Sequence, residues 1–225
     1  MAEFLAIAGE PLPDGPPPAP RLRSAGEAPA AWARRREELG LSAEPLPTVG
    51  LLPGSNAESR RWPSDRFARV ARELAETGAR VYVFGSAGES RLTASVAAEA
   101  AGRAARKGDV VDLGGRTSLE ELAGALLACH LLVTNDTGPM HLAAALDRPI
   151  VALEGAADPA QTRPLASRVR LVGRFDLPCV PCVKNECPRR GRGTVLAEAR
   201  LECMRLIRPE EVLAVSRALL EESVS

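Results

Sequence analysis

Two polar loops follow apolar runs of the sequence and carry residues suited to binding an anion. The candidates are Ser55, Asn56 and Arg60 in PGSNAESRRWP (53–63), and Asp136, Thr137, Gly138 and His141 in NDTGPMH (135–141). Hydroxyl, amide and guanidinium groups donate hydrogen bonds, and a helix that begins near 138 would present free N–H groups to the same ligand. This pattern favours a phosphate site that would fit a nucleoside diphosphate. The alternative is that these are turn residues, with Asp136 capping the helix and His141 playing a structural part.

The elements that must position these loops alternate between short apolar runs and amphipathic runs of helical period. We expect strands at 48–52, 80–84, 109–112, 130–134 and 149–153, and helices near 65–77, 89–101, 118–128 and 138–146. Such alternation is typical of βα units, so the predicted fold is α/β, a doubly wound parallel sheet of the Rossmann-like type. Ligands of this fold bind beyond the carboxyl ends of the strands, where both loops fall. The loops GSAGES (85–90) and GGRTS (114–118) complete that edge.

The chain divides into a lead-in and one domain. Residues 1–47 are expected to be a linker, because residues 10–30 are rich in proline and glycine, with a short helix at 31–40. Residues 48–225 are expected to form the ligand-binding domain. Its regular alternation is predicted to stop after about residue 156, leaving a loop with cysteines at 176–204 and a closing helix at 209–222, which begins at Pro209.

Bulk composition excludes several classes of protein. The 29 basic residues balance the 29 acidic ones, so no net field favours nucleic acid as a partner. The sequence has neither a signal peptide nor an apolar run long enough to span a membrane, which indicates a cytoplasmic protein with reduced thiols. A P-loop motif and a G-x-G-x-x-G motif are also absent from the sequence, which argues against the common nucleotide-triphosphate and dinucleotide folds.

The cysteines of the late loop allow two interpretations. Cys179, Cys182, Cys187 and Cys203 have the spacing C-x2-C-x4-C-x15-C. Four thiolates in such a pattern could bind Zn²⁺ tetrahedrally, whereas reduced thiols could simply pack the loop. The sequence favours the second interpretation.

Longer stretches resemble the lipopolysaccharide heptosyltransferase family, glycosyltransferase family 9. They are PGSNAESRRWPSDRFARVARELAETGARVYVFGSAGE (53–89) and DLGGRTSLEELAGALLACHLLVTNDTGPMHLAAALDRPIVALEGAADP (112–159). The most specific part is D-T-G-x-x-H followed by A-A-L-x-x-P, and the later PCVPC and IRPEEV segments also resemble the family. The resemblance covers about residues 48–216 and corresponds to the C-terminal, donor-binding half of a GT-B glycosyltransferase.

This resemblance implies a function and a set of site residues. Family members transfer heptose from ADP-heptose to the lipopolysaccharide core, with inversion and without a required metal or other cofactor. The residues implied for the donor diphosphate and sugar are Ser55, Asn56, Arg60, Asp136, Thr137, Gly138 and His141. Glu89 matches the position expected to hold the ribose, and Thr117 the position whose backbone meets the base. The acceptor would bring the enzyme at most to the periphery of the inner membrane, on its cytoplasmic face.

The sequence also departs from the family. Glu154 stands where an aromatic residue is usual, and GAADP replaces the commoner GPTDP. Residues 1–47 resemble only the lead-in to the second domain, so we expect the acceptor domain and its general base to lie outside these residues and the isolated chain to lack efficient transfer. Two alternatives stay open: a GT-B transferase for another nucleotide sugar, and a nucleotide-binding module without catalysis. Trp62 could cover the donor pocket, although packing beneath the first helix is favoured.

Overall fold

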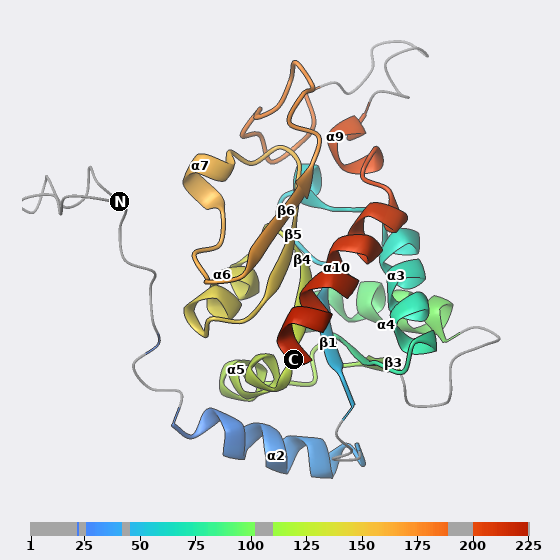
Figure 1. Cartoon of the computed structure of the whole chain (residues 1–225), viewed down its shortest axis with the longest axis vertical. Coiled ribbons are helices and arrows are strands. Elements are labelled where there is room, and N and C mark those ends of the chain that lie inside the picture. Colours follow the sequence, from blue (N-terminus) through green and yellow to red (C-terminus); the bar gives the residue numbers. More distant parts are fainter. Residues whose placement is uncertain (1–21, 23–25, 42–45, 102–109, 189–199, 225) are drawn as a thin grey trace, which may run out of the picture.

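The computed structural model describes residue 22 and residues 26–41, 46–101, 110–188 and 200–224 (Figure 1). Within these ranges the chain forms a parallel sheet of six strands in the order β3-β2-β1-β4-β5-β6. The strands are β1 (Thr48–Leu52), β2 (Arg80–Val83), β3 (Val110–Asp112), β4 (Leu131–Asn135), β5 (Ile150–Glu154) and β6 (Val169–Gly173). The first five confirm the predicted strands to within one or two residues, and the doubly wound order confirms the predicted fold class.

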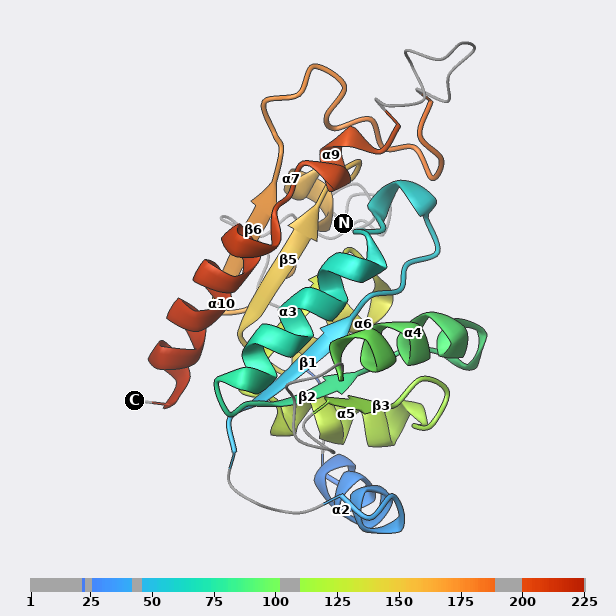
Figure 2. The same ribbon diagram turned by 90° about the vertical axis from the view of Figure 1, so that its right-hand side faces the viewer.

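Helices cover both faces of the sheet (Figures 1 and 2). The helices are α2 (Ala28–Glu38), η1 (Glu58–Arg60), α3 (Ser64–Glu76), η2 (Ala87–Glu89), α4 (Ser90–Ala100), α5 (Leu119–Ala128), α6 (Gly138–Ala145), α7 (Pro159–Thr162), α9 (Glu202–Arg205) and α10 (Pro209–Val224). Phe67 of α3, Val96 of α4 and Leu213 of α10 share one hydrophobic core with one face of the sheet. Leu126 of α5 and Met140 of α6 share a second core with the opposite face. Successive strand residues alternate between these cores, as the two-residue period of a strand requires.

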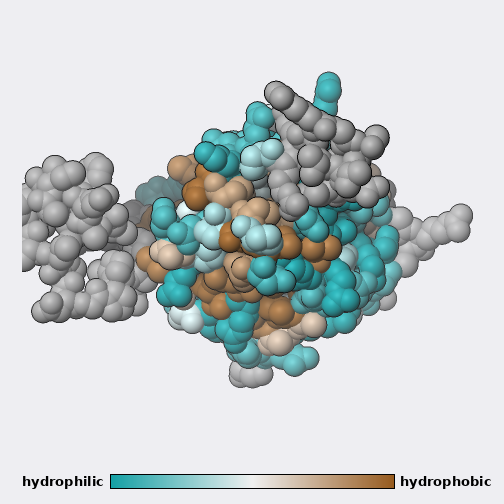
Figure 3. Space-filling model, turned by 90° about the horizontal axis from the view of Figure 1, so that it is seen from above, coloured by the Kyte–Doolittle hydropathy of each residue, from teal (hydrophilic) through white to brown (hydrophobic). Residues whose placement is uncertain are grey.

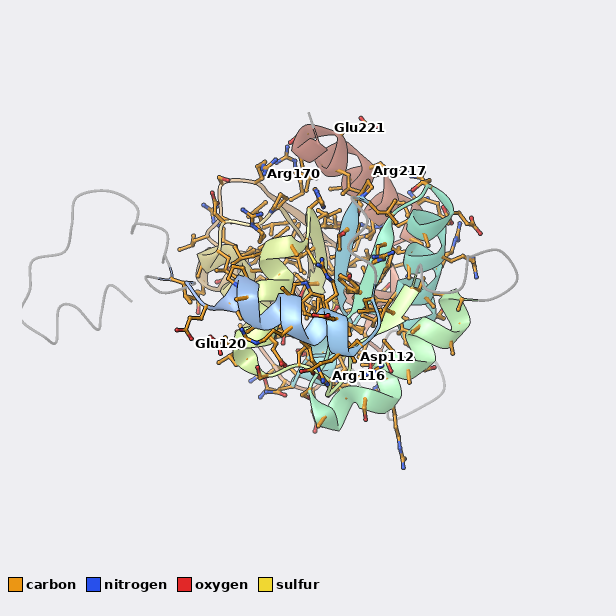
Figure 4. All side chains as sticks on the ribbon, turned by 90° about the horizontal axis from the view of Figure 1, so that it is seen from below. Asp112, Arg116, Glu120, Arg170, Arg217 and Glu221 are labelled. Atoms are coloured by element: carbon orange, nitrogen blue, oxygen red, sulfur yellow. The ribbon has the colours of Figure 1, made fainter. Side chains whose placement is uncertain are left out.

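The predicted separation between lead-in and domain is incomplete, because α2 packs onto the domain. Trp32 of α2 is 3% exposed, and its ring lies edge-on to Tyr82 of β2 with 5.4 Å between centroids. A Cβ atom added to Gly124 of α5 would lie 2.0 Å from the Ala28 carbonyl oxygen, so glycine permits this close helix contact. Arg35 also donates a hydrogen bond of 2.8 Å to the carbonyl oxygen of Arg116. Figure 4 shows α2 from below, on the same side of the molecule as the labelled Arg116.

The expectation that regular alternation stops after residue 156 is wrong. The short α7 and the strand β6 follow, and β6 pairs with β5 along its whole length, from Ile150↔Val169 to Glu154↔Gly173. Strand β6 forms the edge of the sheet, and its residues are mostly half-buried, so it lacks the continuous apolar run of an inner strand. Helix α9 also lies within the segment predicted as an irregular loop, while α10 confirms the closing helix.

None of the helices in the described part of the chain combines the length and the apolarity needed to cross a membrane.

Candidate functional site

The topology creates a crevice between β1 and β4. The chain leaves β1 toward α3 on one face of the sheet, and it leaves β4 toward α6 on the other face. The two connecting loops therefore diverge at the carboxyl ends of adjacent strands, which is the switch point where doubly wound sheets bind ligands. Figure 3 looks down onto this edge of the molecule, where hydrophobic and hydrophilic residues are intermixed.

A larger cavity of about 390 Å³ opens on one side of the crevice. Its apolar wall is formed by Leu52, Phe84, Leu119 and Leu122. Its polar lining residues include Asn56, Ser86, Glu89, Thr117, Ser118, Thr137 and Gly138. An apolar wall next to a ring of hydroxyl and carboxylate groups suits a flat heteroaromatic ligand that carries a sugar.

A second, more polar cavity of about 290 Å³ lies beside it. Its lining residues are Ser55, Asn56, Ala57, Arg60, Asp136, Thr137, Gly138, His141 and Asn185. Asn56, Thr137 and Gly138 line both cavities, so the two form one branched site. The structure thus brings together all nine residues predicted for the donor site. Asn185 escaped prediction, because nothing in its sequence neighbourhood indicates that the cysteine loop folds back over the crevice.

The polar cavity is organised around Asp136, which is 4% exposed. Arg60 Nη1 lies 3.0 Å from Asp136 Oδ2, and His141 Nε2 lies 3.8 Å from Asp136 Oδ1. The His141 side chain is 49% exposed, so it reaches the cavity from the open side. Ser55 fixes the loop by donating a hydrogen bond of 3.1 Å from its hydroxyl to the Asp136 carbonyl oxygen. A cation and an anion are therefore held side by side at the base of the cavity.

Helix α6 begins at this point and has no side-chain cap. Thr137, not Asp136, occupies the N-cap position, and its side chain makes no capping hydrogen bond, so the interpretation of Asp136 as the cap is wrong. Pro139 has no N–H, and the Met140 N–H donates to the Thr137 carbonyl oxygen at 3.1 Å, so among these three residues only the Gly138 N–H lacks a partner in the described part of the chain. The helix dipole adds a partial positive charge. Both effects favour an anion at the place where Thr137 and Gly138 line the cavities.

The larger cavity is bounded by two capping boxes. The Glu89 carboxylate accepts hydrogen bonds of 2.8 Å from the Ser86 backbone N–H and from the Ser86 hydroxyl. A Cβ atom on Gly54 would lie 1.8 Å from Glu89 Oε1, so a larger residue there would displace this carboxylate. At the other end, Ser118 caps α5 reciprocally with Glu121, as predicted, and this places Thr117 on the cavity wall.

Glu154 lies in the same region, at the end of β5. It is fully buried, and neither of its carboxylate oxygens has a hydrogen-bond partner among the described residues. Burial, together with the nearby charge of Asp136, raises the pKa of Glu154 to about 7, while Arg60 acts in the opposite direction. The sequence singled out Glu154 only by its unusual residue type.

The four cysteines of the late loop converge on one small hollow. Cys179, Cys182, Cys187 and Cys203 all line a hollow of about 20 Å³. Among the described residues, however, no three histidine, cysteine or acidic side chains are grouped closely enough to hold a metal ion. Burial and the neighbouring thiols raise the pKa of Cys203 to about 11, so this thiol is protonated near neutral pH. The thiols are gathered as packing of the loop requires, and the zinc interpretation stays a prediction.

Trp62 supports the fold and does not cover the site. It is 2% exposed, lies edge-on to Phe67 with 5.0 Å between ring centroids, and donates from Nε1 to the Ile207 carbonyl oxygen at 3.0 Å. These contacts confirm the favoured packing interpretation.

The fold and the site define a Rossmann-type α/β domain whose switch point is suited to a ligand with a flat ring and an anionic group. The model of glycosyltransferase family 9 (heptosyltransferase) matches residues 19–191, and the chain belongs to this family.

Individual relatives agree with this assignment. Lipopolysaccharide heptosyltransferase 2 of Salmonella typhimurium is 38% identical over 136 residues, which cover 60% of this chain and 38% of that protein. The solved structure of Escherichia coli ADP-heptose lps heptosyltransferase II is 29% identical, with a TM-score of 0.72 over 95% of this chain and 57% of that chain. The dodecameric iron-containing heptosyltransferase TibC in complex with ADP-D-beta-D-heptose is 20% identical with a TM-score of 0.59, covers 80% of this chain and 47% of that chain, and supports the fold alone. This chain therefore spans well under two thirds of the length of these relatives.

Proposed function

We propose that this chain is the donor-binding part of a heptosyltransferase and that it binds ADP-heptose in the crevice between β1 and β4. The observation that carries the proposal is the branched site. An apolar cavity and a polar cavity meet at Asn56, Thr137 and Gly138, next to the uncapped start of α6. A nucleoside diphosphate sugar has the same division into a flat base, a central diphosphate and a polar sugar.

The larger cavity is assigned to the nucleoside. The apolar wall that includes Leu52 and Leu119 would cover the faces of the adenine ring, and the backbone of Thr117, which lines the same cavity, would contact the base. Glu89 would accept hydrogen bonds from the ribose hydroxyls, because its position is already fixed by Ser86. A preorganised carboxylate loses little conformational freedom when the ligand binds.

The polar cavity is assigned to the diphosphate and the heptose. Ser55, Asn56 and the Gly138 N–H at the start of α6 would donate to the phosphate oxygens, and Arg60 would supply positive charge. Transfer of the sugar expels ADP, so negative charge grows on the β-phosphate in the transition state. Donors that are already in place stabilise that charge without having to reorganise. His141, at the open side, would contact the phosphate or the sugar.

The same proposal assigns the acceptor. The heptose would be transferred with inversion to a sugar of the lipopolysaccharide core, and the lipid anchor of that acceptor would bring the enzyme to the membrane surface. The general base that activates the acceptor hydroxyl is assigned to none of the described residues. On its own, this chain would bind the donor but would transfer the sugar inefficiently.

Isothermal titration calorimetry with a panel of donors tests the proposal. We expect saturable one-to-one binding of ADP-heptose and of ADP, and much weaker binding of UDP-glucose and GDP-mannose. Preference for a different nucleotide sugar would favour another GT-B transferase, and binding of none of these ligands would refute the proposal.

A further inference from the structure

Glu154 is held close to the polar cavity by the register of the sheet. Leu153 pairs with Asn135, so the next residues of the two strands, Glu154 and Asp136, lie level with each other. Alternation along β5 places the Glu154 side chain on the same face as Ala152, which belongs to the core shared with α6. The Glu154 carboxyl therefore lies on the side of the sheet where Asp136 meets the start of α6.

Three groups around this point lack hydrogen-bond partners although they are buried. Both oxygens of Glu154, the Oδ2 atom of Asp136 and the Nε atom of Arg60 have no hydrogen bond in the described structure, although Arg60 Nη1 lies 3.0 Å from Asp136 Oδ2. Burying two carboxylates beside one guanidinium is costly unless one of them carries a proton. Asp136 has the close cation, so Glu154 is the one that becomes neutral. The pKa of Glu154 agrees, because burial and then Asp136 raise it to about 7.

The elements around Glu154 carry other charged residues. They are His141 on α6, Asp158 at the start of α7, Arg174 after β6, and Glu202 and Arg205 on α9. The Asp158 carboxylate accepts hydrogen bonds from Ala160 and Gln161 in the first turn of α7. Arg174 donates to the Leu206 carbonyl oxygen and to the Glu211 carboxylate. The charges that act on the Glu154 carboxyl are those of Asp136 and Arg60.

We propose that Glu154 is a positioning residue that sets the affinity of the polar cavity for the donor diphosphate through Arg60. This inference rests on the proposed function. When Glu154 is neutral, Arg60 and Asp136 balance each other, and the guanidinium can turn toward an incoming anion. When Glu154 is ionised, a second carboxylate competes for Arg60 and repels the diphosphate. Donor binding is therefore coupled to a proton on Glu154.

The size of the effect follows from linkage. If only the protonated form binds the nucleotide, the apparent Kd rises by the factor 1 + 10^(pH − pKa), with the pKa of Glu154 at about 7. The factor is about 1 near pH 6 and about 30 near pH 8.5. It is an upper bound, reached when the ionised form does not bind at all.

The test is a calorimetric titration of ADP into the wild-type chain and Glu154→Gln at about pH 6 and about pH 8.5. Gln has nearly the shape of Glu but remains neutral at both values. The ratio of the wild-type Kd to the variant Kd is expected to be near 1 at the lower pH and to approach about 30 at the higher pH. The titration of ADP itself is the same with both proteins and cancels in the ratio. Glu76→Gln, an exposed change at the end of α3, is the matched control and should give a constant ratio.

The possible outcomes are distinct. If ADP binds and the ratio for Glu154→Gln does not change with pH, the role of Glu154 is refuted while the proposed function stands. If the wild-type chain binds ADP at neither pH, both the proposed function and the role of Glu154 fail. Should Glu154→Gln not fold, Glu154→Met has similar volume and no titratable group, and the same pH-dependent ratio is expected for it.

Discussion

Replacing Glu154 should change how the stability of the protein depends on pH, even without any ligand. The usual pKa of a glutamate is 4.5, and burial followed by the charge of Asp136 raises that of Glu154 to about 7 in the folded protein. Between these two values the folded state holds a proton that the unfolded chain releases. The contribution of Glu154 to stability is therefore greatest below about pH 4.5 and falls as the pH rises toward 7.

The magnitude follows from the same interval. At about 1.4 kcal/mol for each pH interval of one, the span from 4.5 to about 7 corresponds to about 3 kcal/mol. Glu154→Gln removes this dependence, because an amide does not titrate. We expect the variant to gain about 3 kcal/mol relative to the wild type between about pH 4.5 and pH 7.5. The constant cost of burying the amide shifts the whole curve and leaves its slope unchanged.

Urea unfolding, followed by far-ultraviolet circular dichroism at several pH values, measures this difference. Other titrating groups contribute equally to both proteins and cancel in the subtraction. The exposed Glu76→Gln serves as a control and should follow the wild type at every pH. A difference between wild type and Glu154→Gln that stays constant with pH would show that the carboxyl ionises normally, and would refute the reasoning.

Three further predictions concern the site and the fold. Arg60→Gln should weaken ADP binding about 10- to 100-fold and leave adenosine binding unchanged, because a charged hydrogen bond to phosphate is lost. Calorimetry measures both affinities, and the exposed Arg91→Gln is the control that should change neither. Gly54→Ala would place a Cβ atom 1.8 Å from the carboxylate that we assign to the ribose, and should weaken ADP binding at least about 10-fold. In the control Gly88→Ala the added Cβ atom would have no neighbour closer than 3.8 Å, so ADP binding should not change. Gly124→Ala would place a Cβ atom 2.0 Å from a carbonyl oxygen of α2, and should lower the free energy of unfolding by about 1 to 3 kcal/mol, measured in urea.

Much of the fold could be predicted because the inner strands are buried on both faces. A short continuous apolar run such as Leu131–Val133, set between longer amphipathic runs, is typical of an inner strand of a parallel sheet. Strand β6 was missed because, at the edge of the sheet, it carries an exposed Arg170 between half-buried neighbours. The docking of α2 was missed because it depends on Gly124, whose contact partner lies far away in the sequence.

The candidate site was predicted in composition but not in arrangement. Topology alone brings the loops after β1 and β4 together, so the location of Arg60 and Asp136 follows from the order of the strands. No local sequence pattern encodes three features that depend on side-chain packing and on the paths of the loops. These are the ion pair of Arg60 with Asp136, the uncapped start of α6 and the position of Asn185 in the lining of the polar cavity. The burial of Glu154 could not be predicted either, because glutamate is a surface residue in most contexts.

A crystal structure of the chain with bound ADP tests the central claim most directly. We predict that the adenine lies against the wall formed by Leu52 and Leu119, and that the diphosphate lies at the start of α6 within hydrogen-bond distance of Arg60. A nucleotide bound outside the crevice between β1 and β4, or one whose diphosphate points away from Gly138, would contradict the account.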